Sequence, residues 1–228
     1  MSSTAIIILI LAGVLLQGAF IVVEHKEKYV PAVILKGSAS LMFVILGFLA
    51  FRGLPGVALA KRIFIGLVFG MLGDILLDLR FVFAENGQKV FLIGIAAFLT
   101  GHILYLVALI PHASRLGLCV GIGAVLAAAL LIYIFKTMTV KTAFKIFGIV
   151  YLGAVIIMTV IALGIALSDP TGQAVTFAAG AVLFTASDIV LIFNTFSGGE
   201  TKFSLRITNL SLYYIGQVLI ACSLFFLV

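Results

Sequence analysis

The chain has 228 residues, of which 64% are hydrophobic and only 10% are charged. Soluble domains carry about 25% charged residues, so this composition excludes a soluble protein and predicts a polytopic membrane protein. With a mean hydropathy of +1.38 there is no room for a separate soluble domain, and we expect one membrane domain over residues 1–228.

Eight apolar runs are each long enough to span ~30 Å of hydrocarbon, which takes about 20 helical residues. They lie near residues 4–23, 32–52, 62–83, 90–110, 115–135, 145–167, 172–195 and 205–227. The first run lacks the basic leader and the cleavage site of a secretory signal, so we expect it to be a retained helix. Short breaks with turn-forming residues such as Pro55 and Pro111 separate the runs. The sequence therefore predicts an all-α bundle of eight transmembrane helices.

Basic residues are distributed unequally over the two ends of this bundle. The end that follows helices 1, 3, 5 and 7 carries ten of the 14 Lys and Arg residues, namely Lys26, Lys28, Lys36, Arg80, Lys89, Lys136, Lys141, Lys145, Lys202 and Arg206. The positive-inside bias predicts that this end is cytoplasmic and that both termini lie outside. We interpret the net charge of +6 as this topology signal and expect no nucleic-acid partner. The compact loops favour a bacterial cytoplasmic membrane.

Small residues recur at helical spacing and predict close contacts between helices. They are Gly66, Gly70 and Gly73, then Gly117 and Gly121, then Ala179 and Gly180. A shift of the sequence by half its length also lays GDILL of residues 73–77 over SDIVL of residues 187–191. Two parallel four-helix repeats, or chance similarity, would explain this match.

Carboxylates inside the apolar runs are the sharpest functional signal. Asp74 and Asp78 lie one helical turn apart in the third run, and Asp188 lies in the seventh. Placing an aspartate at the membrane centre costs about 3 kcal/mol on insertion scales, so such a residue marks a functional site by default. Neither Asp74 nor Asp188 has a Lys or Arg within one turn of its own helix. We therefore predict that these two are functional.

Polar residues of five helices fall into one layer when depth is counted at 1.5 Å per residue. This layer contains Lys36, Asp74, Asp78, His102, Asp188, Tyr213 and Gln217, bordered by Tyr105, Asn194 and Tyr214. It predicts a pocket that opens toward the cytoplasmic leaflet. Helices 1, 5 and 6 carry almost nothing polar at mid-span, apart from Gln17 and Tyr151, and are interpreted as scaffold.

Each of these residues also has a structural alternative. Asp78 could pair with Arg80, Lys89 or Lys36. Lys36 could extend to the membrane interface, and His102 and Tyr105 could cross-link helices by hydrogen bonds.

Two carboxylates in an apolar pocket suit acid and base chemistry. Two ionised carboxylates close together repel, so we expect one to keep its proton while the other is charged. Such a pair could catalyse hydrolysis or carry protons in a transporter. Cys119 and Cys222 have no metal-ligand spacing, and no metal or other cofactor is expected.

Five ordered motifs resemble those of a known family. They are Lys36, Gly73-Asp74-x-x-Leu77, Phe91-x-x-Gly94-x-x-x-Phe98-x-x-x-His102-x-x-Tyr105, Phe184-x-x-Ser187-Asp188-x-x-Leu191-x-x-Asn194-x-Phe196 and Tyr213-Tyr214-x-x-Gln217-x-Leu219. Over nearly its whole length the chain resembles the YhhN-like family of membrane lysoplasmalogenases. It departs from the family pattern at Gly37, where a proline often follows the lysine.

The resemblance implies a lysophospholipid substrate whose vinyl ether bond is hydrolysed to a fatty aldehyde and a glycerophospho-alcohol. It implies that Asp74 and Asp188 are essential, with either one as the acid. The candidate substrate-binding residues are Lys36, His102 and Tyr214 for the phosphate and head group, Asn194, Tyr213 and Gln217 for positioning the aspartates or water, and Asp78 and Tyr105. The alkenyl chain is expected among Phe and Leu side chains, reached from the membrane lipids.

Other functions would use similar residues. A proton-coupled transporter or a lipid-binding scaffold would also use membrane carboxylates, and a hydrolase of another lysolipid would keep the chemistry but change the substrate. An intramembrane aspartyl protease does not fit, because Met71 and Ser187 break its Gly-x-Gly-Asp and Tyr-Asp motifs. The sequence does not indicate which oligomeric state the protein has.

Overall fold

The computed structural model describes residues 3–138, 142–196 and 202–227, and these form an all-α bundle. Its helices are α1 (Ser3–His25), α2 (Tyr29–Phe51), α3 (Ala58–Val82), α4 (Gly87–Leu109), α5 (Leu116–Thr137), α6 (Thr142–Ser168), α7 (Gly172–Phe196) and α8 (Phe203–Ser223). Short 3-10 helices at Ala84–Asn86, Ile110–His112 and Leu224–Phe226 follow α3, α4 and α8. The predicted eight-helix fold is confirmed.

Seven of these helices are long and apolar enough to cross a membrane, judged over the described residues. The exception is α3, which has 25 residues but carries two basic residues near its start and Asp74, Asp78 and Arg80 further along. This helix packs against α2, α4 and α8, and both of its aspartates are buried. Its two carboxyl groups therefore face protein instead of lipid, which is how acidic residues are accommodated in a membrane bundle.

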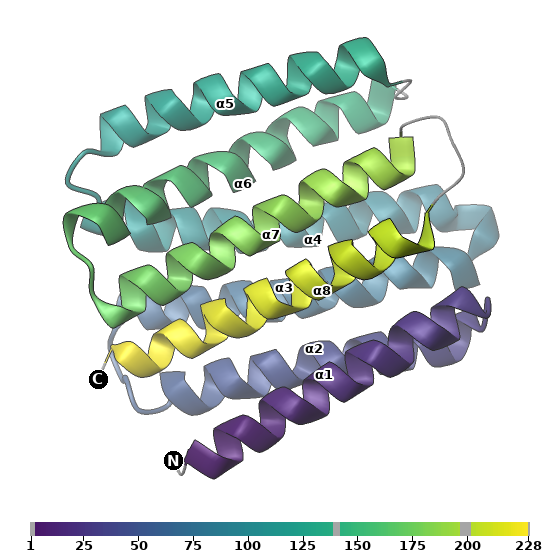
Figure 1. The fold of residues 1–228 in the computed structure, drawn as a ribbon, viewed down its shortest axis with the longest axis horizontal. Helices are drawn as coiled ribbons and strands as arrows, with labels where there is room; N and C mark the ends of the chain where they lie inside the picture. The colour runs from purple at the N-terminus through teal and green to yellow at the C-terminus, as the bar shows by residue number, and fades with distance from the viewer. Residues whose placement is uncertain (1–2, 139–141, 197–201, 228) are drawn as a thin grey trace.

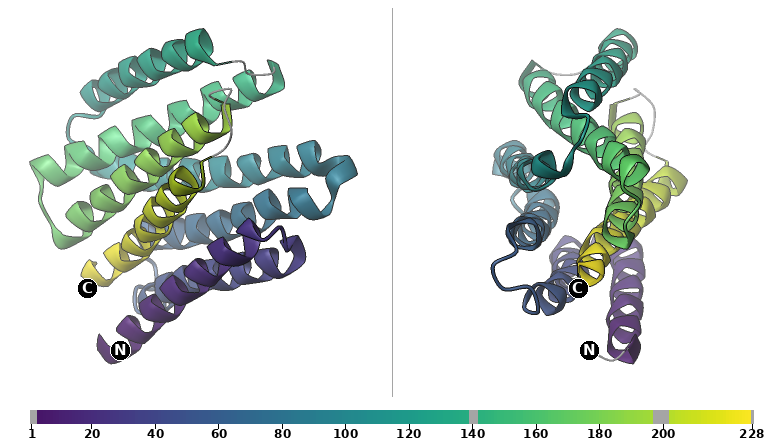
Figure 2. Two further views of the ribbon diagram at one scale, coloured as in Figure 1. Left: turned by 45° about the vertical axis from the view of Figure 1, so that its right-hand side comes forward. Right: turned by 90° about the vertical axis from the view of Figure 1, so that its left-hand side faces the viewer.

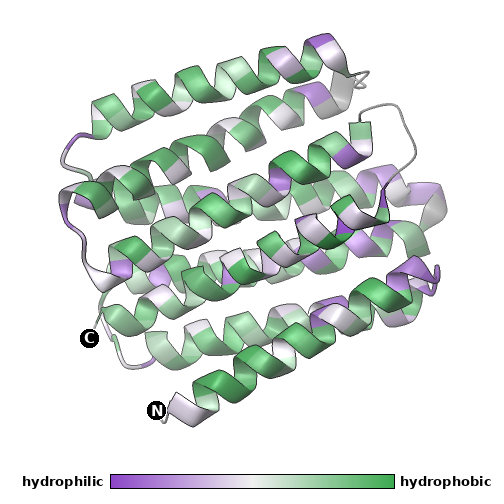
Figure 3. Ribbon diagram, in the orientation of Figure 1, coloured by the Kyte–Doolittle hydropathy of each residue, from purple (hydrophilic) through white to green (hydrophobic). Residues whose placement is uncertain are grey.

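Helices α1 and α5 lie at opposite edges of the bundle, and both termini lie at the same end (Figures 1 and 2). The edge helix α1 packs on α2 and α8, and α5 packs mainly on α6. Hydrophilic residues gather at the helix ends, most densely at the end opposite the termini (Figure 3). That end carries the basic residues described above, except Lys141, which lies outside the described residues. The membrane orientation itself stays a prediction.

Six helices begin one to four residues before the predicted runs, and the starts of α3 and α2 affect the placement of charged residues. Helix α3 begins at Ala58 and not at residue 62, so Lys61 and Arg62 lie within its first turns. There Arg62 Nη1 donates to the Val107 carbonyl at 3.3 Å. Helix α2 begins at Tyr29, with Pro31 in its first turn, where the missing N–H breaks no helical bond. Lys36 therefore lies two turns inside α2 and not at its start.

Glycines bring α7 and α8 into backbone contact. A Cβ atom added to Gly180 would lie 2.7 Å from the carbonyl oxygen of Gly216, and one added to Gly216 would lie 2.9 Å from that of Gly180. The glycines of α3 likewise face side chains of α4 and α8, as Gly73 does with Phe98. The expectation was wrong for Gly117 and Gly121, which face open space because α5 packs on α6 through another face.

We predict that Gly180→Ala will destabilise the protein by about 1–3 kcal/mol, because the added methyl group meets backbone that cannot move aside. The matched control is Gly121→Ala, which has nothing within 4 Å of the new Cβ and should leave the melting temperature unchanged or slightly raised. Thermal unfolding in detergent measures both. Equal melting temperatures for the two variants would contradict the α7–α8 contact.

Candidate active site

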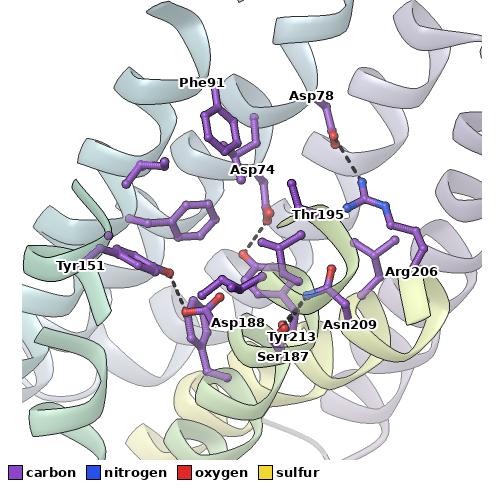
Figure 4. Close-up of a pocket in the computed structure, with 18 of the residues that line it drawn as sticks. Asp74, Asp78, Phe91, Tyr151, Ser187, Asp188, Thr195, Arg206, Asn209 and Tyr213 are labelled. Atoms are coloured by element: carbon purple, nitrogen blue, oxygen red, sulfur yellow. Dashed lines mark hydrogen bonds and ion pairs between the residues drawn. The ribbon is translucent and has the colours of Figure 1, made fainter. Parts of the chain in front are cut away.

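Six helices, α2, α3, α4, α6, α7 and α8, line one cavity toward the end of the bundle opposite the termini (Figure 4). Its volume is about 150 Å³, roughly ten times what a single water needs. Its polar lining residues are Lys36, Asp74, Asp78, Arg80, Tyr151, Ser187, Asp188, Thr195, Arg206, Asn209 and Tyr213. The remaining lining is apolar and includes Leu77, Phe91, Ile95, Phe98, Leu152, Phe184, Leu191 and Ile192. The cavity therefore combines charged groups with an apolar wall.

Asp74 is held by three donors from two neighbouring helices. The Lys36 ammonium lies 3.4 Å from Asp74 Oδ1. The hydroxyl of Tyr213 donates to Oδ2 at 2.7 Å, and the hydroxyl of Ser40, one turn after Lys36 on α2, donates to the same oxygen. Lys36 also lies over the Tyr213 ring, 4.6 Å from its centre. Lys36 therefore points into the pocket and does not extend to the interface.

Asp188 has a different environment. Its Oδ2 accepts a hydrogen bond from the Tyr151 hydroxyl at 2.8 Å, and no ion pair joins it to a cation within the described residues. Tyr151 belongs to α6, so the interpretation of α6 as scaffold alone was wrong. Its single mid-span tyrosine reaches the cavity, as Figure 4 shows. Both aspartates thus line one cavity. Asp74 has a cation beside it, whereas Asp188 has a tyrosine hydroxyl.

A charged cluster lies at the end of the cavity near the α8 start. Asp78 Oδ1 is 3.9 Å from Arg206 Nη2, and Arg206 in turn binds Glu24 of α1 through two nitrogens, one of them Nε at 3.1 Å. Among the described residues, Asp78 forms its ion pair with Arg206 and not with the three predicted cations. Sequence reasoning missed this pair because its members belong to helices that are distant in the sequence.

A second missed contact joins α7 to α8. Asn209 Nδ2 donates to the backbone oxygen of Ser187 at 2.9 Å and to its hydroxyl at 2.8 Å. Both residues line the cavity. Spacing could have revealed Asn209, because Asn209, Tyr213 and Gln217 recur every four residues and so share one face of α8.

Three predicted binding residues of α7 and α8 lie outside the cavity. Tyr214 donates to the backbone oxygen of Ala39 at 3.1 Å, which ties α8 to α2. Gln217 Nε2 donates to the Tyr213 hydroxyl at 3.3 Å, so it contacts Asp74 only through that tyrosine. Asn194 Oδ1 accepts the backbone N–H of Lys202 at 2.8 Å and so links the end of α7 to the start of α8.

The two predicted residues of α4 also lie outside the lining. His102 Nδ1 is 2.8 Å from the Phe98 carbonyl of its own helix, and its ring packs on Phe184 at 4.6 Å. Within the described residues, His102 Nε2 and the Tyr105 hydroxyl have no hydrogen-bond partner. They meet neighbouring helices by ring contacts, as Tyr105 does with Phe177, and not by the hydrogen-bonded cross-link considered above.

The lining of the cavity has a charged side and an apolar side. Charged groups of α2, α3 and α8 face apolar side chains of α4, α6 and α7, which suits a polar head and an apolar chain. Asp74 of α3 and Asp188 of α7 point into the cavity (Figure 4). Their carboxyl groups could exchange protons with a ligand or water bound there. No group of three or more His, Cys, Asp or Glu side chains in the described residues could hold a metal ion.

Comparison with known proteins gives one match. A family model described as the YhhN family matches residues 32–224. This range runs from the first turn of α2 to the end of α8 and includes every residue that lines the cavity. No curated protein and no solved structure matches the chain.

We predict that Lys36→Met will lower the free energy of unfolding by about 3–5 kcal/mol, because it leaves the Asp74 carboxylate buried without its cation. The double variant Lys36→Met/Asp74→Asn should regain most of that loss. Lys89→Met, at an exposed lysine, is the matched control and should change little. Unfolding in mixed detergent measures the cycle, and simple additivity of the two single losses would contradict the pairing.

Proposed function

This chain belongs to the YhhN family, which includes lysoplasmalogenases, and on that premise we propose that it is a membrane-embedded hydrolase of lysoplasmalogens. The proposed reaction cleaves the vinyl ether bond to give a fatty aldehyde and a glycerophospho-alcohol. One observation carries the proposal. Two carboxyl groups line the same amphipathic cavity. One is paired with Lys36, and the other is bound, among the described residues, only by a tyrosine hydroxyl.

Hydrolysis of a vinyl ether begins with protonation of its β-carbon. The electrons of the double bond form the new C–H bond, and the α-carbon and oxygen become an oxocarbenium ion. Asp188 suits the role of acid, because no cation of the described residues is paired with it and a neutral carboxyl group costs least in an apolar wall. The Tyr151 hydroxyl positions this group toward the cavity.

Asp74 suits the complementary role. Its pairing with Lys36 and the bonds from Ser40 and Tyr213 favour the carboxylate and hold it in one orientation. A fixed carboxylate beside the cavity stabilises the developing oxocarbenium ion and orients the water that attacks its α-carbon. The attacking water gives one proton back to Asp188, which restores the acid. The hydroxyl proton of the resulting hemiacetal then passes to the glycerol oxygen as the C–O bond breaks, which gives the aldehyde and the glycerophospho-alcohol.

The apolar wall gives the alkenyl chain a place. Phe91, Ile95, Leu152 and Ile192 come from α4, α6 and α7, and they face the charged side of the cavity. A lysolipid whose chain lies against this wall would present its ether oxygen to the two carboxyl groups.

A transporter is the alternative from a different class. Transporters commonly bind substrate where helices are interrupted near the membrane midplane. Here α3 and α7 each run unbroken for 25 residues through the two aspartates. This continuity supports hydrolysis over transport.

We predict that the purified protein will release aldehyde from a 1-alkenyl lysophospholipid and that Asp74→Asn and Asp188→Asn will each lower kcat at least about 100-fold. Tyr151→Phe should lower it about tenfold by freeing the acid to rotate. The matched control is Asp169→Asn, at an exposed aspartate outside the cavity, which should keep full activity.

Melting curves would establish that each variant is folded. Absence of aldehyde from the folded parent, with both choline and ethanolamine head groups, would overturn the proposal. In that case another lysolipid or transport becomes the better hypothesis.

A further inference from the structure

Three cationic side chains line the cavity, and two of them already have carboxylate partners. Lys36 pairs with Asp74 at 3.4 Å. Arg206 is bound by a glutamate of α1 and lies 3.9 Å from Asp78. The third, Arg80, forms no hydrogen bond or ion pair with any residue that the structure describes. Among the described residues, Arg80 is therefore the cation of the cavity lining that has no carboxylate partner.

Aromatic rings hold Arg80 at the edge of the cavity. Its guanidinium carbon lies 4.5 Å from the ring centre of Phe81 and 4.6 Å from that of Phe91. Contacts of this kind fix a guanidinium through the ring faces and leave its N–H donors unused. A planar fork of free donors is the usual partner of a phosphate group.

Asp78 lies two residues before Arg80 on α3 and also lines the cavity. Its Oδ1 faces Arg206, but its buried Oδ2 has no hydrogen-bond partner among the described residues. A buried carboxylate oxygen without a donor is costly unless a ligand or water supplies one. The same stretch of α3 thus offers free donors and a free acceptor.

The charges at this end of the cavity balance before any ligand binds. Arg80 and Arg206 carry two positive charges, and Asp78 and Glu24 carry two negative ones. A ligand with an uncompensated negative charge would upset this balance in a poorly solvated place, whereas a zwitterion would preserve it. The charge pattern therefore favours a head group that joins a phosphate to an amine.

We propose that Arg80 binds the phosphate and that Asp78 Oδ2 receives the ammonium of a phospho-amine head group. This assignment rests on the proposed lysolipid substrate. Asp74 lies six residues before Arg80 on α3, about 9 Å along the helix axis, a distance that a glycerol phosphate unit and its contact with the guanidinium can span. A phosphate held at Arg80 would thus place the ether bond of the same lipid at the level of Asp74. Arg80 and Asp78 are binding and specificity-determining residues, not catalytic ones.

The test measures binding apart from turnover. The probe is radiolabelled 1-alkyl glycerophosphoethanolamine, which has no vinyl double bond to protonate, bound to the protein in nanodiscs with empty nanodiscs subtracted. We expect Arg80→Gln to weaken binding about tenfold to hundredfold, as loss of a charged hydrogen bond does, and Arg80→Lys to weaken it less. Lys89→Gln removes an exposed charge outside the cavity and is the matched control. Equal affinities of Arg80→Gln and this control would overturn the assignment.

Competing ligands identify what each residue recognises. We expect 1-alkyl glycerol, which has no phosphate, to compete equally well in the parent and in Arg80→Gln. Asp78→Asn should weaken competition by the phosphoethanolamine lipid but not by 1-alkyl glycerol phosphate, which has no amine. Glycerophosphoethanolamine and inorganic phosphate distinguish a head-group site from a site for free phosphate, and stronger binding of inorganic phosphate than of the lipid would contradict the proposal.

Turnover then separates this proposal from the proposed reaction. With a 1-alkenyl substrate, Arg80→Gln should raise KM at least tenfold and leave kcat within about twofold, because uniform binding is lost. Arg80-dependent binding without any aldehyde would support the head-group site and refute the hydrolase. Aldehyde release by Arg80→Gln with an unchanged KM would support the hydrolase and refute the head-group site.

Discussion

The requirement that every buried charge meets a partner on another helix governs this structure. An ion left alone in a low-dielectric interior costs several kcal/mol, far more than one apolar contact returns. Lys36 of α2 therefore meets Asp74 of α3, and Arg206 of α8 meets Glu24 of α1 and Asp78 of α3. These pairs fix the central, charged helix α3 among neighbours that surround it. The cavity lies beside them because α7 and α6 complete the wall with apolar side chains.

The same requirement separates the roles of the two aspartates. Asp74 is part of the charge-paired framework, whereas Asp188 sits across the cavity with a tyrosine hydroxyl as its partner. An acid and a base made from one residue type need such unequal surroundings. The proposed hydrolysis uses this inequality directly, and in the proposed binding mode Arg80, which has no ion-pair partner among the described residues, holds the phosphate end of the substrate. The Lys36–Asp74 pair thus stabilises the helix bundle, and Asp188, without such a pair among the described residues, is the proposed acid.

Run length predicted the eight helices, which the structure confirms. The cost of a membrane carboxylate singled out Asp74 and Asp188, which both line the cavity, while their role in function stays a prediction. Of the predicted polar layer, Lys36, Asp74, Asp78, Asp188 and Tyr213 line the cavity. The position of a residue along a helix does not say toward which neighbour its side chain points. Tyr214 and Gln217 therefore belong to the predicted layer but contact α2 and Tyr213 instead of lining the cavity. Ser40, Tyr151 and Arg206 were missed as partners because each contact joins different helices. The four-helix repeat stays a prediction.

The central claim is protonation of a vinyl ether carbon by a carboxyl group, and hydrolysis in D₂O tests it most directly. Mass spectrometry of the released aldehyde should find one deuterium on the carbon next to the carbonyl, formed at a rate that falls with Asp188→Asn. The rate should also be lower in D₂O than in H₂O, because the proton moves in the first chemical step. Aldehyde without deuterium at that carbon would contradict the account.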